Sequence, residues 1–378
     1  MRIIIIGGGI GGLATAVMLH KNGFDVKVYE QSATFSPLGA GIGIGSNAMQ
    51  ALQEMGIEEE VMANATPLTT QIFQDAKGHI LNTIDFSLFK RKYGFENVTI
   101  HRADLHKALV NALPPKTIAY NRRCEHVSTH HNGVIAVFSD GISVKADVII
   151  AADGIHSPIR QQLQDNSKPR YAGYTCWRGL AHNDGLIATN TSTEVWDASG
   201  RFGYAPLQDN TVYWFACVNS KANNTFYQQL TTEELAFHFK KFPQAVTQLI
   251  KKTAPQHVLH HDIYDIKPLR HFVYGRVVLI GDAAHATTPN MGQGAGQAIE
   301  DAVTLVNAIK RYPLRRALQK YEQARIKHTH KVTTLSRQIG WAAQWDSKSA
   351  VHFRNQVFPL IPSQLLFKRL QFLFERKW

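Results

Sequence analysis

Cysteine is scarce in this sequence. Cys124, Cys176 and Cys217 are the only three cysteines in 378 residues, and they lie far apart along the chain. No CxxC pair and no zinc-ligand spacing is present, so a disulfide framework, a bound metal and a dithiol reductase are not indicated. We therefore expect reduced thiols in a cytoplasmic protein that holds no metal.

Long hydrophobic runs are missing as well. No apolar stretch reaches the roughly 20 residues that a helix needs to cross a bilayer, although 44% of the residues are hydrophobic. The first residues already have the pattern of a buried strand, and we expect no signal peptide. A chain of this length is predicted to fold as two or three domains.

Positive charge is in excess but is not concentrated in one place. The formal net charge is +12 at pH 7, yet the lysines and arginines are scattered, without repeats or RNA-binding signatures. We therefore predict no nucleic-acid partner. A positive field would instead raise the local concentration of anionic substrates and of a nicotinamide cofactor.

The first thirty residues carry the strongest signal. Residues 2–6 are an apolar run typical of a buried parallel strand, residues 26–29 are another, and a helical pattern lies between them. The turn after the first run has glycines at GxGxxG spacing, and an acidic residue ends the second run: Gly7, Gly9, Gly12 and Glu30. In a dinucleotide-binding βαβ unit such glycines allow a tight turn and a close approach to a pyrophosphate, and the acid binds ribose hydroxyls.

Two further apolar runs end in turns that contain a carboxylate. Residues 148–152 precede a DGxxSxxR pattern made by Asp153, Gly154, Ser157 and Arg160. Residues 276–280 precede a GDAAH stretch and a glycine-rich turn, with the residues Asp282, His285, Pro289, Gly292 and Gly294. Both carboxylates would lie at the carboxyl ends of buried strands, where ligands bind in open α/β sheets.

Together, these three turns resemble the flavoprotein aromatic hydroxylases of the p-hydroxybenzoate hydroxylase type, over about the first 340 residues. The resemblance implies an α/β fold, with a Rossmann-like FAD-binding domain, an inserted, mainly antiparallel β-sheet substrate domain and C-terminal helices. It places residues 1–70, 97–170 and 273–340 in the FAD-binding domain, 71–96 and 171–272 in the substrate domain, and 341–378 in a C-terminal helical segment.

The resemblance also assigns contacts with FAD. Asp282 would accept a hydrogen bond from a ribityl or ribose hydroxyl, and Arg102 would bind the pyrophosphate. The N–H groups of Ala295 and Gly296, before a helix predicted over 297–310, would stabilise negative charge on the flavin. The other expected cofactor residues are in the glycine-rich segments: Gly7, Gly9, Gly12, Glu30, Gly41, Asp153, Gly154, Pro289, Gly292 and Gly294. Gly41 belongs to a loop expected over 39–45, beside the path of the flavin ring.

The chemistry that the resemblance implies is that of a single-component monooxygenase. NADH or NADPH would reduce FAD, O2 would form a C4a-hydroperoxide, and one oxygen would pass to a small, electron-rich aromatic or heteroaromatic substrate. His285 is given a structural role. The oligomeric state stays open between monomer and homodimer.

Short segments rich in β-branched and aromatic residues predict one mainly antiparallel sheet above the flavin. They lie at 71–73, 171–180, 193–196, 202–206 and 212–218. Alternation sends Tyr213, Phe215 and Cys217 to one face. Arg201 and Tyr213 resemble an arginine and a tyrosine that meet the substrate in the FAD-dependent urate hydroxylases of the same group, and we expect them to be the catalytic residues, unless they serve only for packing.

Two other functions remain open at this stage. One is a different oxidoreductase on the same scaffold, an epoxidase or a reductase; the halogenase signature WxWxIP is absent. The other is a peripheral membrane or protein-binding flavoprotein that acts through the amphipathic segment 363–378. We prefer a terminal helix packed on the protein itself, because amphipathic helices usually face their own core.

Overall fold

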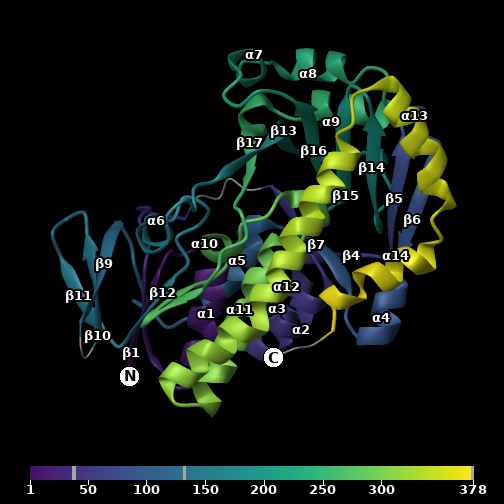
Figure 1. Ribbon diagram of the computed structural model, residues 1–378. Helices are drawn as coiled ribbons and strands as arrows, with labels where there is room; N and C mark the ends of the chain where they lie inside the picture. Colours follow the sequence, from purple (N-terminus) through teal and green to yellow (C-terminus); the bar gives the residue numbers. More distant parts are fainter. Residues whose placement is uncertain (36–39, 131–132, 376–378) are drawn as a thin grey trace.

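The structure is a computed structural model that describes residues 1–35, 40–130 and 133–375. The strands of these residues form four sheets, of six, seven, three and three strands. The six- and seven-stranded sheets lie in separate parts of the molecule, and the long helix α12 (Leu314–Ala343) extends from one toward the other (Figure 1).

The six-stranded sheet has the order β18-β19-β12-β1-β2-β8, in which only β18 and β19 are antiparallel. Its strands are β1 (Arg2–Ile6), β2 (Asp25–Tyr29), β8 (Ile118–Ala119), β12 (Val148–Ala151), β18 (Val273–Tyr274) and β19 (Val277–Leu279). The strands predicted at 2–6, 26–29, 148–152 and 276–280 agree with these to within a residue. The side chains of β12 and β19 are all buried, as expected for a parallel sheet covered on both faces.

Helices α1 (Ile10–Lys21) and α11 (Gly294–Arg311) pack closely against each other beside this sheet. Gly11 permits the approach, because a Cβ at this position would lie 3.1 Å from the Cβ of Ala298. Nine of the twelve residues of α1 are buried, so this helix belongs to the core and is not amphipathic.

Two three-stranded sheets flank this core. One is the antiparallel unit β9 (Cys124–His130), β10 (Gly133–Phe138) and β11 (Ser143–Ala146), which projects at the left of Figure 1. The other has the order β3-β7-β4, with β3 (Gly41–Ile44), β4 (Ala65–Leu68) and β7 (Asn97–His101). The expectation of a loop over 39–45 is therefore wrong for 41–44, since β3 pairs with β7 throughout; Gly39 lies outside the described residues.

The seven-stranded sheet has the order β17-β13-β16-β15-β14-β5-β6, and only the β14–β5 pair is parallel. Its strands are β5 (Thr70–Asp75), β6 (Ile80–Asp85), β13 (Arg170–His182), β14 (Thr191–Asp197), β15 (Gly200–Pro206), β16 (Thr211–Asn219) and β17 (Leu259–Asp265). The mainly antiparallel sheet is thus present. The boundaries of the predicted domains stay a prediction.

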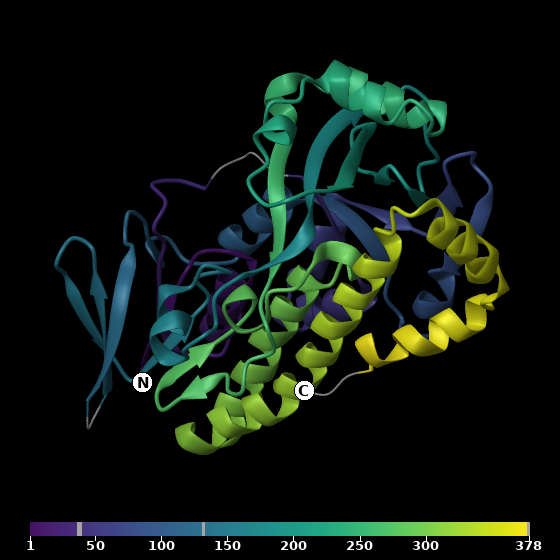
Figure 2. The ribbon, with the colours of Figure 1, turned by 45° about the horizontal axis from the view of Figure 1, so that its top comes forward.

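One face of the seven-stranded sheet is covered by helices, and Figure 2 shows them across its top. They are α7 (Thr225–Gln228), α8 (Thr232–His238), α9 (Gln244–Lys252) and the 3-10 turn η1 (Pro255–His257). Trp177, Phe202 and Trp214 form a core with Leu235 and Phe239 of this layer. The opposite face contacts other parts of the chain: Trp196 stacks on Phe358 of the C-terminal segment, and the ring of Tyr213 packs on Gly41 of β3.

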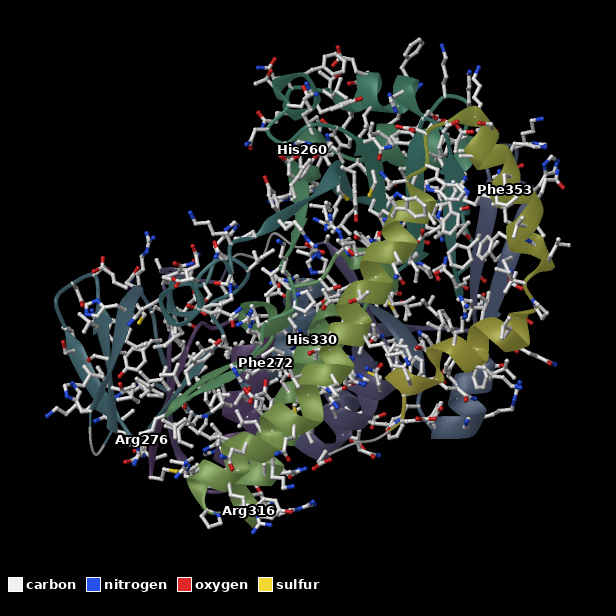
Figure 3. All side chains as sticks on the ribbon, viewed as in Figure 1. His260, Phe272, Arg276, Arg316, His330 and Phe353 are labelled. Atoms are coloured by element: carbon white, nitrogen blue, oxygen red, sulfur yellow. The ribbon has the colours of Figure 1, made fainter. Side chains whose placement is uncertain are left out.

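Shorter helices connect the strands. They are α2 (Ser46–Met55), α3 (Glu58–Ala63), α4 (Ser87–Tyr93), α5 (Arg102–Asn111), α6 (Pro158–Leu163), α10 (Asp282–His285) and η2 (Pro289–Met291). In Figure 3, Phe272 and His330 lie together where α12 passes the six-stranded sheet, and their rings are 6.1 Å apart.

The C-terminal segment consists of α13 (Lys348–Val357), η3 (Phe358–Leu360), α14 (Ser363–Leu370) and η4 (Gln371–Leu373). Leu373 and Phe374 are buried against Phe89 of α4 and Val332 of α12, which favours a segment packed on the protein itself. None of the helices in the described residues is long and apolar enough to pass through a bilayer.

Candidate active site

The glycine-rich turn between β1 and α1 is shaped by its neighbours at two positions and is open at a third. A Cβ at Gly7, whose φ is +106°, would lie 2.3 Å from the Ala152 carbonyl oxygen, and one at Gly12 would lie 2.0 Å from the Gly7 oxygen. A Cβ at Gly9 would meet nothing within 4 Å. Packing thus explains Gly7 and Gly12, whereas the open space at Gly9 fits the approach of a phosphate to the free N–H groups of the first turn of α1.

Glu30 stands beside this turn at the end of β2. Its carboxylate accepts hydrogen bonds from the N–H of Gly8 at 2.7 Å and of Ser32 at 2.9 Å. These bonds fix the carboxylate where a ribose bound at the turn would reach it.

Asp153, directly after β12, is the buried carboxylate of the second turn. Both of its oxygens are out of contact with solvent and lack a hydrogen bond of good geometry among the described residues, although the Ser157 side chain is close enough to act on the carboxyl. Burial raises the pKa of this carboxyl, while Ser157 and Arg160 act in the opposite direction. Buried carboxylates without partners are costly, so a ligand with hydroxyl groups fits this position.

Arg160 connects the second turn, after β12, with the third turn, after β19. It is fully buried, and its guanidinium donates to the carbonyl oxygens of Ile155 at 2.5 Å, Ser167 at 3.0 Å and Ala283 at 3.4 Å. Since Ala283 belongs to α10, Arg160 positions the loop after β12 against the loop after β19.

Asp282 begins α10, and its side chain is exposed. The surrounding protein nevertheless raises the pKa of its carboxyl, and the positive charges of His285, Arg102 and Arg160 oppose this rise. Arg102, the first and exposed residue of α5, is close enough to contribute its charge to Asp282, so the structure brings together two residues far apart in the sequence.

The glycine-rich turn after Pro289 leads into α11. Gly292 has a φ of +61°, Gln293 is the N-cap, and the helix begins at Gly294, three residues before the predicted start at 297. Ala295 and Gly296 therefore lie in the first helical turn, where backbone N–H groups have no partner within the helix. These N–H groups and the helix dipole favour negative charge at this end of α11.

A buried polar network under α11 was not foreseen from the sequence. Arg325 of α12 binds Glu300 at 2.6 Å and Asp301 at 2.7 Å. Asp301 in turn accepts from the N–H of Gly281 at 2.9 Å and lies 2.6 Å from Nε2 of His285. The network holds α10, with Asp282, against α11, and it gives His285 the structural role expected for it.

The face of the seven-stranded sheet opposite the α7–α9 layer carries the predicted substrate residues. Cross-strand pairing places Cys176, Arg178, Arg201, Gly203, Tyr213, Phe215 and Cys217 on this face. Gly203 allows the ring of Phe215 to lie over β15, since a Cβ at Gly203 would come within 2.2 Å of that ring. Sequence reasoning missed Arg178, although the same alternation that selected Tyr213 could have found it.

Arg201 is 1% exposed, yet its Nε and Nη1 atoms have no hydrogen-bond partner among the described residues. Glu194 lies 3.8 Å from Nη1, Nη2 is 3.8 Å from Sγ of Cys217, and Cζ lies 5.4 Å from the centre of the Phe215 ring. The guanidinium is therefore charged and buried, but only partly satisfied.

Tyr213 shares this face with Arg201, but the two are not cross-strand neighbours. Tyr213 pairs with Ala205, Arg201 pairs with Cys217, and Phe215 lies between them. A hydrogen bond joins Tyr213 to Arg178. Burial raises the pKa of the Tyr213 hydroxyl, and the Arg178 charge partly offsets this. Gly41 of β3 packs on the Tyr213 ring, because a Cβ at Gly41 would lie 2.5 Å from Cγ of the tyrosine.

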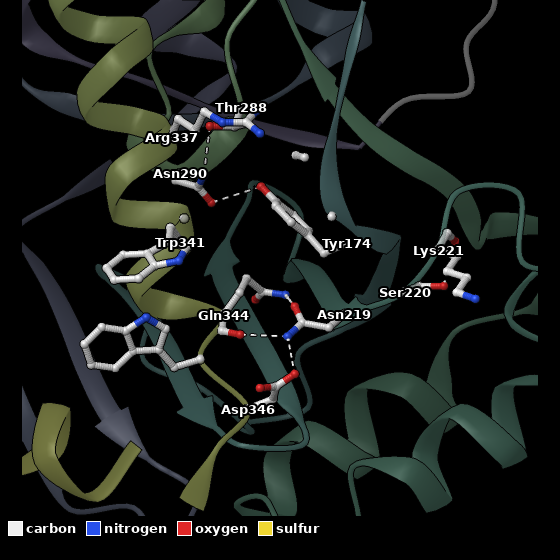
Figure 4. A pocket seen from close by; sticks show the side chains of 14 residues that line it. Tyr174, Asn219, Ser220, Lys221, Thr288, Asn290, Arg337, Trp341, Gln344 and Asp346 are labelled. Carbon is white, nitrogen blue, oxygen red and sulfur yellow. Dashed lines mark hydrogen bonds between the residues drawn. The ribbon is translucent and has the colours of Figure 1, made fainter. Parts of the chain in front are cut away.

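A cavity of about 550 Å³ adjoins this face beyond Tyr174 (Figure 4). The Tyr174 hydroxyl donates to Oδ1 of Asn290 at 3.2 Å, next to Pro289. Trp341 and Gln344, near the end of α12, line the far side. Tyr174 also packs with Cys176 and Cys217 in one buried cluster.

The arrangement defines the class of the protein as a flavoprotein, because three turns at the carboxyl ends of neighbouring strands fit an extended dinucleotide and FAD suits their donors and acceptors. Residues 1–336 match the model of the FAD binding domain family. The chain belongs to this family.

Curated relatives extend over most of the chain. It is 32% identical over 364 residues to the aurachin C monooxygenase/isomerase of Stigmatella aurantiaca, with 96% of this chain and 95% of that protein covered. It is 32% identical to 6-hydroxynicotinate 3-monooxygenase of Pseudomonas fluorescens, covering 90% and 91%. It is 31% identical to an FAD-dependent urate hydroxylase of Klebsiella pneumoniae, covering 86% of each.

Solved structures give the same picture. Klebsiella pneumoniae HpxO, complexed with FAD and uric acid, matches with a TM-score of 0.93 and 27% identity over 99% of this chain and 96% of that one. A salicylate hydroxylase substrate complex matches with a TM-score of 0.82 and 27% identity, covering 100% and 96%. These findings confirm the resemblance to the FAD-dependent aromatic hydroxylases, the fold class, FAD as cofactor and monooxygenase as enzyme class. The roles of the individual site residues stay predictions.

Proposed function

We propose that this enzyme uses NADH or NADPH and O2 to insert one oxygen atom into a small aromatic or heteroaromatic ring that carries an anionic or carbonyl group. The buried and incompletely bonded guanidinium of Arg201 carries this proposal. A charged group held away from water is costly unless it is paired, and a planar anion would provide the acceptors that Nε and Nη1 lack. The relatives support an aromatic or heteroaromatic ring, since their names include urate and 6-hydroxynicotinate.

The substrate residues of the seven-stranded sheet would have the following roles. Arg201 binds and orients the acceptor group of the substrate, and Phe215 packs against its ring. Tyr213, held by Arg178, orients the substrate or relays a proton from it, which makes the ring more electron-rich. When bound, FAD supplies the redox chemistry with O2.

Flavin binding would rest on the three turns. Gly9 and the start of α1 would face the pyrophosphate together with Arg102, Glu30 would bind ribose hydroxyls, and Asp153 and Asp282 would accept from further hydroxyls. The start of α11 at Ala295 and Gly296 would bind the carbonyl edge of the flavin ring.

A screen of flavin reduction tests the proposal. Small aromatic acids, purines and hydroxypyridines would be mixed anaerobically with the yellow enzyme and NADH or NADPH, and bleaching of the flavin would be followed. We expect at least one anionic ring to accelerate reduction and to be hydroxylated once air is admitted. Its neutral analogue, with an ester or amide in place of the acid, should do so far less.

Two results would oppose this assignment. Equal acceleration by the anionic compound and its neutral analogue would show that Arg201 does not select for charge. Hydroxylation of the anionic compound with unchanged efficiency by Arg201→Gln would remove the guanidinium from the substrate site.

A further inference from the structure

Four residues form a straight row across the face of the seven-stranded sheet that lies opposite the α7–α9 layer. Arg201 of β15 pairs with Cys217 of β16, Cys217 pairs with Cys176 of β13, and Cys176 pairs with His261 of β17. Directly opposite residues point to the same face. Two of the three cysteines therefore lie side by side, although 40 residues of sequence separate them.

The geometry of this pair suits a disulfide. Opposite residues of an antiparallel pair have Cα atoms about 4.5–5.5 Å apart, within the range of roughly 4.4–6.8 Å that a disulfide spans. Cys176 and Cys217 are 1% and 0% exposed, all three cysteines are free thiols, and a hydrogen bond joins this pair. A zinc site is not indicated, since the described residues contain no group of three possible metal ligands.

The hydrogen bond within the pair, together with two nearby positive charges, favours a thiolate on one sulfur. The hydrogen bond with Cys217 lowers the pKa of Cys176, against the effect of burial, and Arg178 and Arg201 add to the lowering. Burial raises the pKa of Cys217, so that sulfur keeps its proton. A thiolate is the nucleophilic form of cysteine.

One end of the row lies near solvent. His261, directly opposite Cys176 on the edge strand β17, has an exposed side chain, so the row reaches solvent at this end. The other end of the row is Arg201, in the proposed substrate site.

We propose that Cys176 and Cys217 form a peroxide-oxidisable dithiol site on the substrate-facing surface, which closes to a disulfide under hydrogen peroxide. The Cys176 thiolate attacks one peroxide oxygen, the O–O bond breaks, and hydroxide leaves and is protonated to water, giving a sulfenic acid. Cys217 sulfur then attacks the Cys176 sulfur, an S–S bond forms, and the second oxygen leaves as water. Both sulfurs are oxidised, and one H2O2 is reduced to two H2O.

The proposed function enters only as the source of peroxide, which reduced flavin produces with O2 when no substrate is hydroxylated. The closed bond would join β13 to β16 and would alter the thiol that accepts a hydrogen bond from Arg201. It would leave the three FAD turns untouched, so the oxidised enzyme should keep its flavin.

The test uses the resting holoenzyme, reduced and desalted, without substrate or nicotinamide. It would be treated with a small molar excess of H2O2, quenched, unfolded and alkylated, and its intact mass measured. We expect the number of alkylated thiols to fall from three to one and to return to three after treatment with dithiothreitol. Digestion of the oxidised enzyme should yield a peptide linked through Cys176 and Cys217. Because peroxide is added directly, the outcome does not depend on the proposed substrate or reaction.

Cys124 supplies the matched control, being buried but distant in the fold, in β9. Under H2O2, the Cys124→Ser enzyme should lose both of its remaining thiols to the disulfide, whereas the Cys176→Ser enzyme should form no intramolecular disulfide. Retention of three thiols by the wild-type enzyme would overturn the proposal, as would loss of Cys124 at the same rate as the pair. The linked peptide from the wild type keeps the test decisive if a variant fails to fold.

Discussion

At the scale of single residues, the cofactor site depends on charges that do little for the empty protein. Asp282 and Arg102 are exposed and follow different strands, and the charge of Arg102 acts on the Asp282 carboxyl. We predict that Asp282→Ala and Arg102→Ala lower FAD occupancy while the apoprotein melts almost as before, because each loses charged hydrogen bonds to FAD worth about 1.5–3 kcal/mol, and exposed charges contribute little to an empty fold.

The measurement is the flavin-to-protein ratio together with melting curves of both forms. Lys107→Ala, an exposed change on the same helix as Arg102, should retain full occupancy. Equal destabilisation of the apo and holo forms would assign Asp282 and Arg102 to structure.

The substrate face gives a second prediction for single residues. Arg201→Lys keeps the charge but loses the planar fork, and Tyr213→Phe loses only the hydroxyl that Arg178 holds. Both should leave FAD binding unchanged and lower product formation by up to about a hundredfold, since a displacement of about 1 Å can cost that much. More H2O2 should form for each NADH consumed. If both variants hydroxylate the true substrate with normal coupling, these two residues serve only for packing.

At the scale of elements, α10, α11 and α12 are joined by the buried network around Arg325. Removing the guanidinium would leave Glu300 and Asp301 as buried, unpaired carboxylates. We predict that Arg325→Met lowers the free energy of unfolding by about 3–5 kcal/mol, the range for breaking a buried ion pair. Denaturant unfolding would measure this, with the exposed Arg315→Met on the same helix as control. A loss no larger than that of the control would contradict the assigned role.

The same network predicts a dependence on acid. Burial alone would raise the pKa of Asp301, but His285 and Arg325 outweigh it and bring the pKa to about 2, from a usual value of 3.8. A carboxyl with a lowered folded-state pKa contributes stability above its unfolded-state pKa and loses it as the pH falls toward the folded value. Unfolding curves should thus show a loss of about 2 kcal/mol between about pH 4 and pH 2. Asp301→Asn should lack this component, and parallel losses in both proteins would contradict it.

The elements differ in how far the sequence could predict them. The strands β1, β2, β12 and β19 and their turns were predictable because a continuous apolar run, a glycine and a carboxylate are local signals. Strand β3 was not, because Gly41 and Gly43 lower its β propensity and its pairing with β7 is decided elsewhere in the chain. The start of α11 at Gly294 was not predicted, because glycines weaken the helical pattern.

The site was predictable in part for the same reason. Arg201 and Tyr213 were selected by strand alternation and resemblance, and alternation could also have selected Arg178, but the Cys176–Cys217 pair depends on the register between β13 and β16. Register between strands is set by packing over the whole sheet, and no local pattern reports it.

At the scale of the whole molecule, the proposed reaction requires both of the large sheets. The six-stranded sheet offers the FAD turns, the seven-stranded sheet offers the face with Arg201, and α12 spans the distance between them (Figure 1). FAD and substrate would meet where these parts face each other, near Pro289 and Tyr174. The central claim is that oxygen from O2 is transferred to a ring bound at this place.

The most direct measurement of that claim is turnover under isotopically labelled O2 with NADH and the compound that accelerates flavin reduction most strongly. We expect a hydroxylated product that carries one labelled oxygen atom for each NADH consumed, with little H2O2. A product whose added oxygen comes from water, or NADH oxidation that yields only H2O2 with every anionic ring, would contradict it.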